Sequence, residues 1–190
     1  MPERGPLELI WTTTEPDAVR ARLARLGLTE RTDGRSSAPP VVITVVGDPD
    51  STADSLMVGE PLAAESDEAP TVAPRLAALG WATVDTERFA ADLERELMGE
   101  PVRMPSLGAD ATRVASADGS AITLILLEPI TEGRIAAALV RHAEGPIALY
   151  LDDVSAPDDA FASEPSPLGR TVRLIRPAPP SGPFILAVDP

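Results

Sequence analysis

Apolar and polar residues alternate over the first predicted strand, Leu7 to Thr13, so that Leu7, Leu9 and Trp11 share one face. The next four residues, Thr14 to Asp17, are typical of a helix start: a capping threonine, a proline in the first turn and acids near the positive end of the helix dipole. Gly27 predicts where this helix ends. Its inward side chains follow at helical spacing: Val19, Leu23 and Leu26.

The rest of the chain continues in short strands and few helices. A second helix is predicted from Thr86 to Met98 with Phe89, Leu93 and Leu97 inward, and a third from Gly133 to Ala143 with Thr131 as its cap. Strands are predicted at Val41–Val46, Leu56–Val58, Trp81–Val84, Thr112–Ala115, Ile122–Leu127, Ile147–Leu151, Val172–Ile175 and Phe184–Val188. Segments rich in proline, serine and acids predict loops at Arg31–Pro40, Ala63–Pro74 and Ser155–Leu168, and Asp118-Gly119 predicts a turn.

An internal repeat organises this pattern. The two tryptophans, Trp11 and Trp81, are 70 residues apart, and other pairs match at the same offset. These pairs are Leu9 and Leu79, Thr13 and Thr83, Glu15 and Asp85, Asp17 and Glu87, Val19 and Phe89, Ala21 and Ala91, and Leu23 and Leu93. When the offset is changed by two residues, Ser55–Leu62 aligns with Thr123–Ile130, and both segments have a Glu-Pro pair at the same position. The series predicts a duplicated strand–helix–strand–strand unit.

Composition excludes several classes of function. The 190 residues contain no cysteine, one histidine, 30 acids and 16 basic residues, all arginine, with a net charge of -14. Disulfides, thiolate metal sites and thiol nucleophiles are therefore excluded, and a nucleic-acid or anionic membrane partner is disfavoured because no basic stripe exists. Neither a signal peptide nor a membrane-spanning run is expected. Together these features favour a cytoplasmic protein whose core is aliphatic, since aromatic residues make up only 3% of the chain.

The order of elements from Leu79 to Val188 resembles the vicinal oxygen chelate superfamily, the glyoxalase and bleomycin-resistance-like proteins, and is closest to methylmalonyl-CoA epimerase-type domains. The likeness lies in Ile125-Leu-Leu-Glu-Pro129, Ile135-Ala136, Leu139, Glu144-Gly145 and Asp152-Asp153-Val154. The resemblance implies an α+β fold in which repeated βαβββ modules form a curved mixed sheet with helices on the outside. We expect residues 1–76 to be a diverged βαββ module, and residues 77–190 a glyoxalase-like pair of modules whose second helix is shortened to Ala156–Ala162.

The superfamily holds a metal with histidine and glutamate or glutamine on facing strands, and this chain departs from that pattern. The equivalent positions fall at Trp81 or Leu9, at Pro146, at Ala187 and at Ile125, whose side chains cannot coordinate a metal. A borderline or soft metal needs imidazole or thiolate donors, which one histidine cannot supply. We therefore expect no metal site and no cofactor.

Few residues remain as candidates for chemistry. His142 ends a helix and has only Glu144 nearby, so it is a weak candidate for a general base. Glu60 and Glu128 precede prolines at matching strand ends, where they are either paired carboxylates or solvated strand terminators. Asp152-Asp153 is either a site for a hard cation or a solvated turn.

The hypothesis of a ligand-binding cavity depends on the two tryptophans. Placed at equivalent positions of two copies, they are expected to face each other where the superfamily has its ligand cavity, unless they fill the core. The candidate ligand-binding residues are Trp11, Thr13, Trp81, Thr83 and Tyr150, and Met57 is a further option.

The sequence therefore favours metal-free binding of a small, mostly apolar molecule in a cleft. Two alternatives stay open. One is an isomerase or lyase that uses carboxylates such as Glu128 or Asp152 with a hard cation. The other is a non-catalytic module that dimerises or docks a partner, and a homodimer is plausible in either case.

Overall fold

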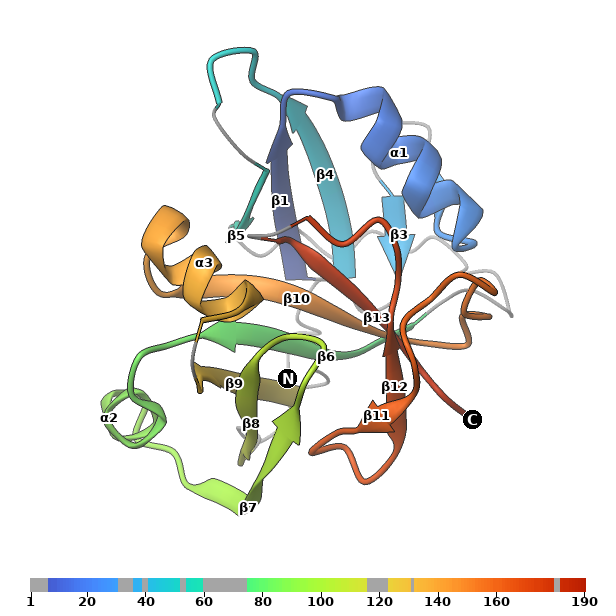
Figure 1. Cartoon of the computed structure of the whole chain (residues 1–190). Coiled ribbons are helices and arrows are strands. Elements are labelled where there is room, and N and C mark those ends of the chain that lie inside the picture. Colours follow the sequence, from blue (N-terminus) through green and yellow to red (C-terminus); the bar gives the residue numbers. More distant parts are fainter. Residues whose placement is uncertain are drawn as a thin grey trace, which may run out of the picture. The chain divides into compact units, whose positions relative to one another are not determined.

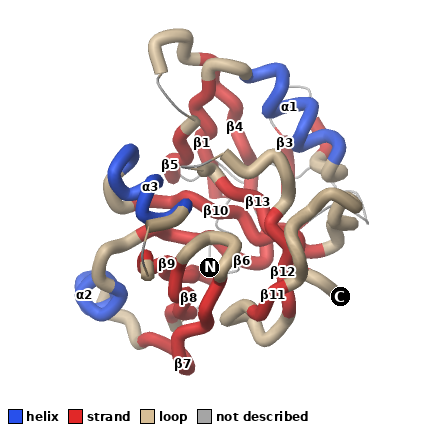
Figure 2. Tube along the Cα trace, in the orientation of Figure 1, coloured by secondary structure: helices blue, strands red, loops and turns tan. Residues whose placement is uncertain are grey.

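The computed structural model describes residues 7–30, 36–38, 41–51, 54–59, 75–115, 123–130, 132–179 and 182–190. Strands dominate the regular structure (Figure 2), and none of the helices in the described ranges is long and apolar enough to cross a membrane. The chain divides into two compact units, Met1–Leu76 and Ala77–Pro190. The predicted turn at Asp118-Gly119, the cap Thr131, the acid Glu60 and the loop Ala63–Pro74 lie outside the described residues.

In its described residues the first unit has one helix and a five-stranded sheet (Figure 1). Its elements are β1 (Leu7–Thr13), α1 (Pro16–Arg25), β2 (Thr29–Glu30), β3 (Ser36–Ala38), β4 (Val41–Gly47) and β5 (Ser55–Val58), and the strand order is β2-β3-β4-β1-β5. The central pair, β1 and β4, is parallel, and the other pairs are antiparallel. The prediction of a loop over Arg31–Pro40 was wrong for residues 36–38, because these residues pair with β4 as strand β3.

The second unit builds an eight-stranded sheet from two halves. The first half contains β6 (Arg75–Ala82), α2 (Thr86–Asp92), β7 (Leu97–Met104), β8 (Ala109–Val114) and β9 (Thr123–Pro129). Helix α3 (Arg134–His142) leads to the second half, which contains β10 (Gly145–Asp152), β11 (Glu164–Pro165), β12 (Thr171–Leu174) and β13 (Phe184–Val188). The strand order is β11-β12-β13-β10-β6-β9-β8-β7.

Both halves use one connectivity. In each half the first strand pairs in parallel with the last, β6 with β9 and β10 with β13, and the remaining neighbours are antiparallel. The predicted α+β class with curved mixed sheets is therefore confirmed, and each half is a βαβββ module or a reduced form of it. The first unit joins β1, α1, β2, β3 and β4 in the same way. Whether the units arose by duplication stays a prediction.

One of the sequence matches behind that prediction is wrong. The sequence repeat aligns the segment that contains β5 with the segment that contains β9. However, β9 is parallel to β6, whereas β5 is antiparallel to β1. The strand of the first unit that corresponds to β9 is β4, which is parallel to β1.

Two predicted helices differ from the structure. Helix α2 ends at Asp92 rather than Met98, because Glu94 adopts a positive φ of 55° and residues from Leu97 onward pair with β8. Leu93, predicted inward, is consequently 42% exposed. The short helix predicted at Ala156–Ala162 is absent; a turn from Pro157 to Ala160 takes its place.

Candidate functional site

Side chains from both halves of the second sheet meet on one face, which we call the inner face. Strand alternation places Ile125 and Leu127 of β9 on this face, and Leu126 on the opposite, outer face. Helix α3 packs on the inner face through Ile135 and Ala138, whereas α2 packs on the outer face through Ala90. The resemblance drawn from sequence predicts a ligand cavity at Trp11 and Trp81, with Tyr150 as a further lining residue.

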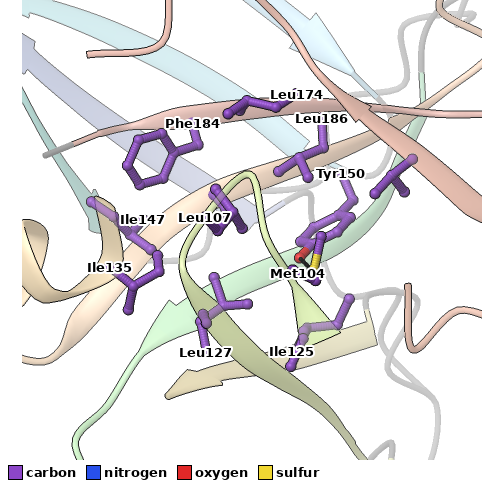
Figure 3. Close-up of a cluster of buried hydrophobic side chains, with 14 of the residues drawn as sticks. Met104, Leu107, Ile125, Leu127, Ile135, Ile147, Tyr150, Leu174, Phe184 and Leu186 are labelled. Carbon is purple, nitrogen blue, oxygen red and sulfur yellow. Dashed lines mark hydrogen bonds between the residues drawn. The ribbon is translucent and has the colours of Figure 1, made fainter. Parts of the chain in front are cut away.

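The inner face is filled with buried apolar side chains (Figure 3). Tyr150 of β10 points toward Met104 at the end of β7, and its hydroxyl lies 3.4 Å from the methionine sulfur. All of the following are at most 3% exposed: Ala78, Ala82, Met104, Leu107, Ala109, Ala111, Ile125, Leu127, Ile135, Ala138, Ile147, Ala148, Tyr150, Val172, Leu174, Phe184, Leu186 and Val188. These residues form a closed core, and Tyr150 belongs to it.

The two edges of the curved sheet are joined by one carboxylate. Glu164 of β11 accepts hydrogen bonds from the backbone N–H of Ser106, at 3.0 Å, and from the hydroxyl of the same residue. Ser106 directly follows Pro105 at the end of β7, and β7 and β11 lie in contact there. Since Glu164 is only 8% exposed, these bonds satisfy a charge that burial would otherwise penalise. We call this Ser106–Glu164 contact the seam.

Packing at Gly80 shows how tightly the inner face is filled, and leads to a first prediction. A Cβ atom on Gly80 would lie 2.7 Å from the Ala148 Cβ and 3.2 Å from Cε2 of Tyr150. We expect Gly80→Ala to lower the free energy of unfolding by about 1–3 kcal/mol, because the core must move to admit one methyl group. Urea unfolding measures this. Gly145→Ala is the matched control, since nothing lies within 4 Å of its added Cβ; equal losses in the two variants would contradict tight packing at Gly80.

The inner face does not fit the metal site that the resemblance implies. Of the positions assigned to metal ligands, Ile125 faces inward, but strand alternation points Trp81 and Ala187 to the other face. The inward neighbours of these two are Gly80, Ala82, Leu186 and Val188, which are equally unable to coordinate. Among the described residues no group of three or more histidine, cysteine or acidic side chains could hold a metal ion.

The five predicted ligand-binding residues do not gather on one face. Trp11 is fully buried in the first unit, where its Nε1 donates to Asp54 at 3.1 Å, and Thr13 is also buried. In the second unit Trp81 lies on the outer face and stacks at a tilt against Phe89, with ring centres 5.4 Å apart. Tyr150 lies on the inner face.

The two threonines have a common structural role. The Oγ1 of Thr13 accepts from the N–H of Glu15 at 3.1 Å, and the Oγ1 of Thr83 accepts from the N–H of Asp85 at 3.3 Å. Each hydroxyl therefore holds the turn between a strand and the helix after it. Thr83 additionally donates to Glu144 at 2.6 Å.

The acids proposed for catalysis are engaged in structural contacts. Glu128 accepts from the N–H and the hydroxyl of Thr86, both at 3.0 Å, and so anchors the start of α2. Asp152 pairs with Arg170 at 2.7 Å. His142 is the last residue of α3 and is half-buried.

Sequence analysis assigned no role to the Glu144 side chain, which has several hydrogen-bond donors in the structure. Glu144 accepts from the Thr83 hydroxyl, from the N–H of Val84 at 2.9 Å and from Nη2 of Arg88, which donates to both carboxylate oxygens at 2.6 and 2.7 Å. These donors, with the Thr83 hydroxyl contributing most, lower the pKa of Glu144 from 4.5 to about 2. The contacts join the end of α3 to the turn between β6 and α2. No local signal reveals them, because the partners are about 60 residues apart.

No family model matches the sequence, and no curated protein matches it. Among solved structures, methylmalonyl-CoA epimerase from Mycobacterium tuberculosis is 22% identical, covers 60% of this chain and 87% of its own, and has a TM-score of 0.47. The epimerase from Streptomyces coelicolor, in complex with 2-nitronate-propionyl-CoA, is 19% identical, with coverages of 60% and 95% and a TM-score of 0.44.

A hypothetical protein from Bacillus halodurans is 17% identical, covers 62% of this chain and 94% of its own, and also has a TM-score of 0.44. The chain is thus similar in structure to methylmalonyl-CoA epimerases, which belong to the vicinal oxygen chelate superfamily, as the sequence resemblance predicted.

Proposed function

We propose that this chain is a non-catalytic docking protein, and that its second unit binds a basic amphipathic segment of a partner on the outer face, around α2. The observation that carries the proposal is the filled inner face: Tyr150, one of the predicted ligand-binding residues, is fully buried there together with Phe184 and Met104. A protein that keeps the scaffold but fills its cavity must use another surface for recognition. The partner-docking alternative drawn from sequence is therefore favoured over a ligand cleft.

The α2 surface is apolar and incompletely covered. It consists of the half-buried Trp81, Phe89, Leu97 and Leu124 together with Leu93, which is 42% exposed. Helix α2 has only seven residues, too few to cover the strands beneath it. Phe89 and Leu93 are four residues apart and hence share one side of the helix end. Apolar side chains that gather in this way on a surface typically mark an interaction site.

Charge specifies the kind of partner. The segment from Asp85 to Glu96 contains five acids and two arginines, and Arg88 is already paired with Glu144 and Asp92. The rim of the α2 surface is therefore acidic, as is the whole chain at a net charge of -14. A second copy would bring like charges together, whereas a segment with lysine or arginine beside apolar residues would be attracted.

The test uses the fluorescence of Trp81. Trp11→Phe leaves Trp81 as the only tryptophan, and we titrate this variant with a designed helical peptide of leucine and lysine, and with its leucine–glutamate counterpart. We expect the basic peptide alone to change the Trp81 emission. Leu93→Ser combined with Glu94→Lys and Glu96→Lys should weaken binding at least about tenfold, equivalent to about 1.4 kcal/mol.

The control variant carries the same changes elsewhere: Val140→Ser, at a side chain 91% exposed on α3, with Asp158→Lys and Asp159→Lys. Equal weakening in both triple variants would show nonspecific charge attraction and would reject the α2 surface. A concentration-dependent dimer in sedimentation, lost in the α2 variant, would instead assign this surface to a second copy.

Metal-free binding of a small apolar molecule stays a second candidate for one reason. The Nε1–H of Trp81 is buried and has no acceptor among the described residues, and a buried donor without a partner costs about 1–3 kcal/mol. A flat molecule with one acceptor, seated against Trp81 and Phe89, would satisfy it. In the Trp11→Phe background, quenching by small aromatic ketones that is competitive with the peptide would favour this candidate.

A further inference from the structure

Two guanidinium groups share one aromatic ring in the second unit. Arg134 is the first residue of α3, Arg176 follows β12, and Phe161 lies in the segment between β10 and β11. The Cζ of Arg176 lies 4.0 Å from the ring centre of Phe161, and that of Arg134 lies 4.9 Å from it. Both Cζ atoms lie within 4.9 Å of the Phe161 ring centre, so the two guanidinium carbons are less than twice 4.9 Å apart. The ring face attracts each cation, but it does not cancel their mutual repulsion.

No carboxylate of the described residues pairs with either arginine, although the chain has 30 acids and 16 arginines. The nearby Glu164 is held at the seam by both donors of Ser106. Arg134 donates one bond, from Nη1 to the carbonyl oxygen of Ser106 at 2.7 Å, and its Nε is buried with no acceptor in the described part of the chain. Positive charge and hydrogen-bond donors are thus left over at this point of an acidic protein.

The remaining donors suit an anion with several oxygen atoms. A guanidinium presents parallel N–H groups that bind a carboxylate or a phosphate at two oxygens. Arg134 also stands at the N-terminal end of α3, whose dipole adds partial positive charge. We infer that Arg134 and Arg176, oriented by Phe161, form a binding site for a small anion or for a ligand bearing a phosphate or carboxylate group. This site is separate from the α2 surface, and the inference does not depend on the proposed function.

The experiment compares inorganic phosphate and succinate with chloride at equal ionic strength, on the full chain, by isothermal titration and by thermal unfolding. We expect one or both of the two anions to bind and to raise the unfolding midpoint, while chloride does not. Phosphate alone would assign the site to phosphate-bearing ligands, and succinate alone to carboxylates. No binding of either anion would overturn the inference.

Three variants locate the site. Arg176→Gln and Arg134→Gln are each expected to weaken anion binding at least about tenfold, and Phe161→Leu should weaken it less. Arg103→Gln is the matched control, because Arg103 is exposed and pairs with Asp110 on neighbouring strands. Arg176 is itself exposed, so its variant keeps the test valid if Arg134→Gln disturbs the start of α3. Binding that is unchanged in Arg176→Gln, or weakened equally in Arg103→Gln, would overturn the inference.

Discussion

Replacing Tyr150 by alanine is expected to lower the free energy of unfolding of the second unit by about 3–5 kcal/mol, the usual range for removing a large buried ring. The side chain is fully buried between strands of both halves. Its hydroxyl lies against the Met104 sulfur, and its ring lies so close to Gly80 that a Cβ atom on that residue would crowd it. Tyr150→Phe removes only the hydroxyl and its weak contact with sulfur, and should cost less than about 1.5 kcal/mol. Urea unfolding followed by circular dichroism measures both variants.

The same residue predicts a response to alkaline pH. Burial, helped by the charge of Glu164, raises the pKa of the Tyr150 phenol above its usual range. The folded state therefore prefers the neutral phenol. Its stabilising contribution is complete below the unfolded pKa of about 10 and is lost as the pH rises above that value. Tyr150→Phe should flatten this alkaline decline in stability.

These variants separate a core residue from a ligand-binding residue. In an open cleft, Tyr150→Ala would leave the free energy of unfolding nearly unchanged, and the alkaline response would be that of an ordinary exposed phenol. Either result would contradict the filled inner face and, with it, the argument that recognition has moved to the α2 surface.

The fold was predictable where local patterns carry it. The alternation over residues 7–13 and the run at Phe184–Val188 each became a strand with the predicted bounds. The helical spacing after Pro16 became α1. In these segments an alternating, a helical or a continuously apolar pattern matches the burial of the element that forms, so local sequence and tertiary structure agree.

Prediction failed where pairing between distant strands decides the structure. Leu93 and Leu97 continue the helical spacing of α2, but β7 begins at Leu97 because its backbone pairs with β8, opposite Val114. The predicted helix after β10 did not form: after the single turn from Pro157 to Ala160, the N–H of Phe161 donates to the carbonyl of Leu174, the last residue of β12, at 3.0 Å.

The candidate sites depend on which face a residue occupies, and a shift of one residue reverses this in a strand. Trp81 was expected to share a cavity with Tyr150, yet the two lie on opposite faces of the second sheet. The group of Arg134, Phe161 and Arg176 comes from three segments without a common motif. Tertiary contacts between these separate segments bring them together, which a local sequence pattern does not record.

Glu144→Gln is expected to lower the free energy of unfolding by about 1–3 kcal/mol at neutral pH, because Thr83, Val84 and Arg88 lose their charged acceptor. The Glu144 side chain is 28% exposed, so solvent screens part of the interaction with Arg88 and keeps the loss below that of a buried ion pair. Glu87→Gln is the matched control, since Glu87 is exposed in the first turn of α2.

The pH dependence identifies the cause of this loss. The hydrogen bonds of Thr83, Arg88 and Val84 lower the pKa of Glu144 to about 2, so the folded state favours the carboxylate. The stabilisation is present above the ordinary pKa of 4.5 and disappears as the pH falls toward 2. Unfolding measured at pH 7, 4 and 3 should therefore show the wild-type chain and Glu144→Gln converging in acid, while Glu87→Gln stays parallel to the wild type. A constant difference between wild type and Glu144→Gln at all three pH values would mean that the side-chain charge does not hold the end of α3 to the start of α2.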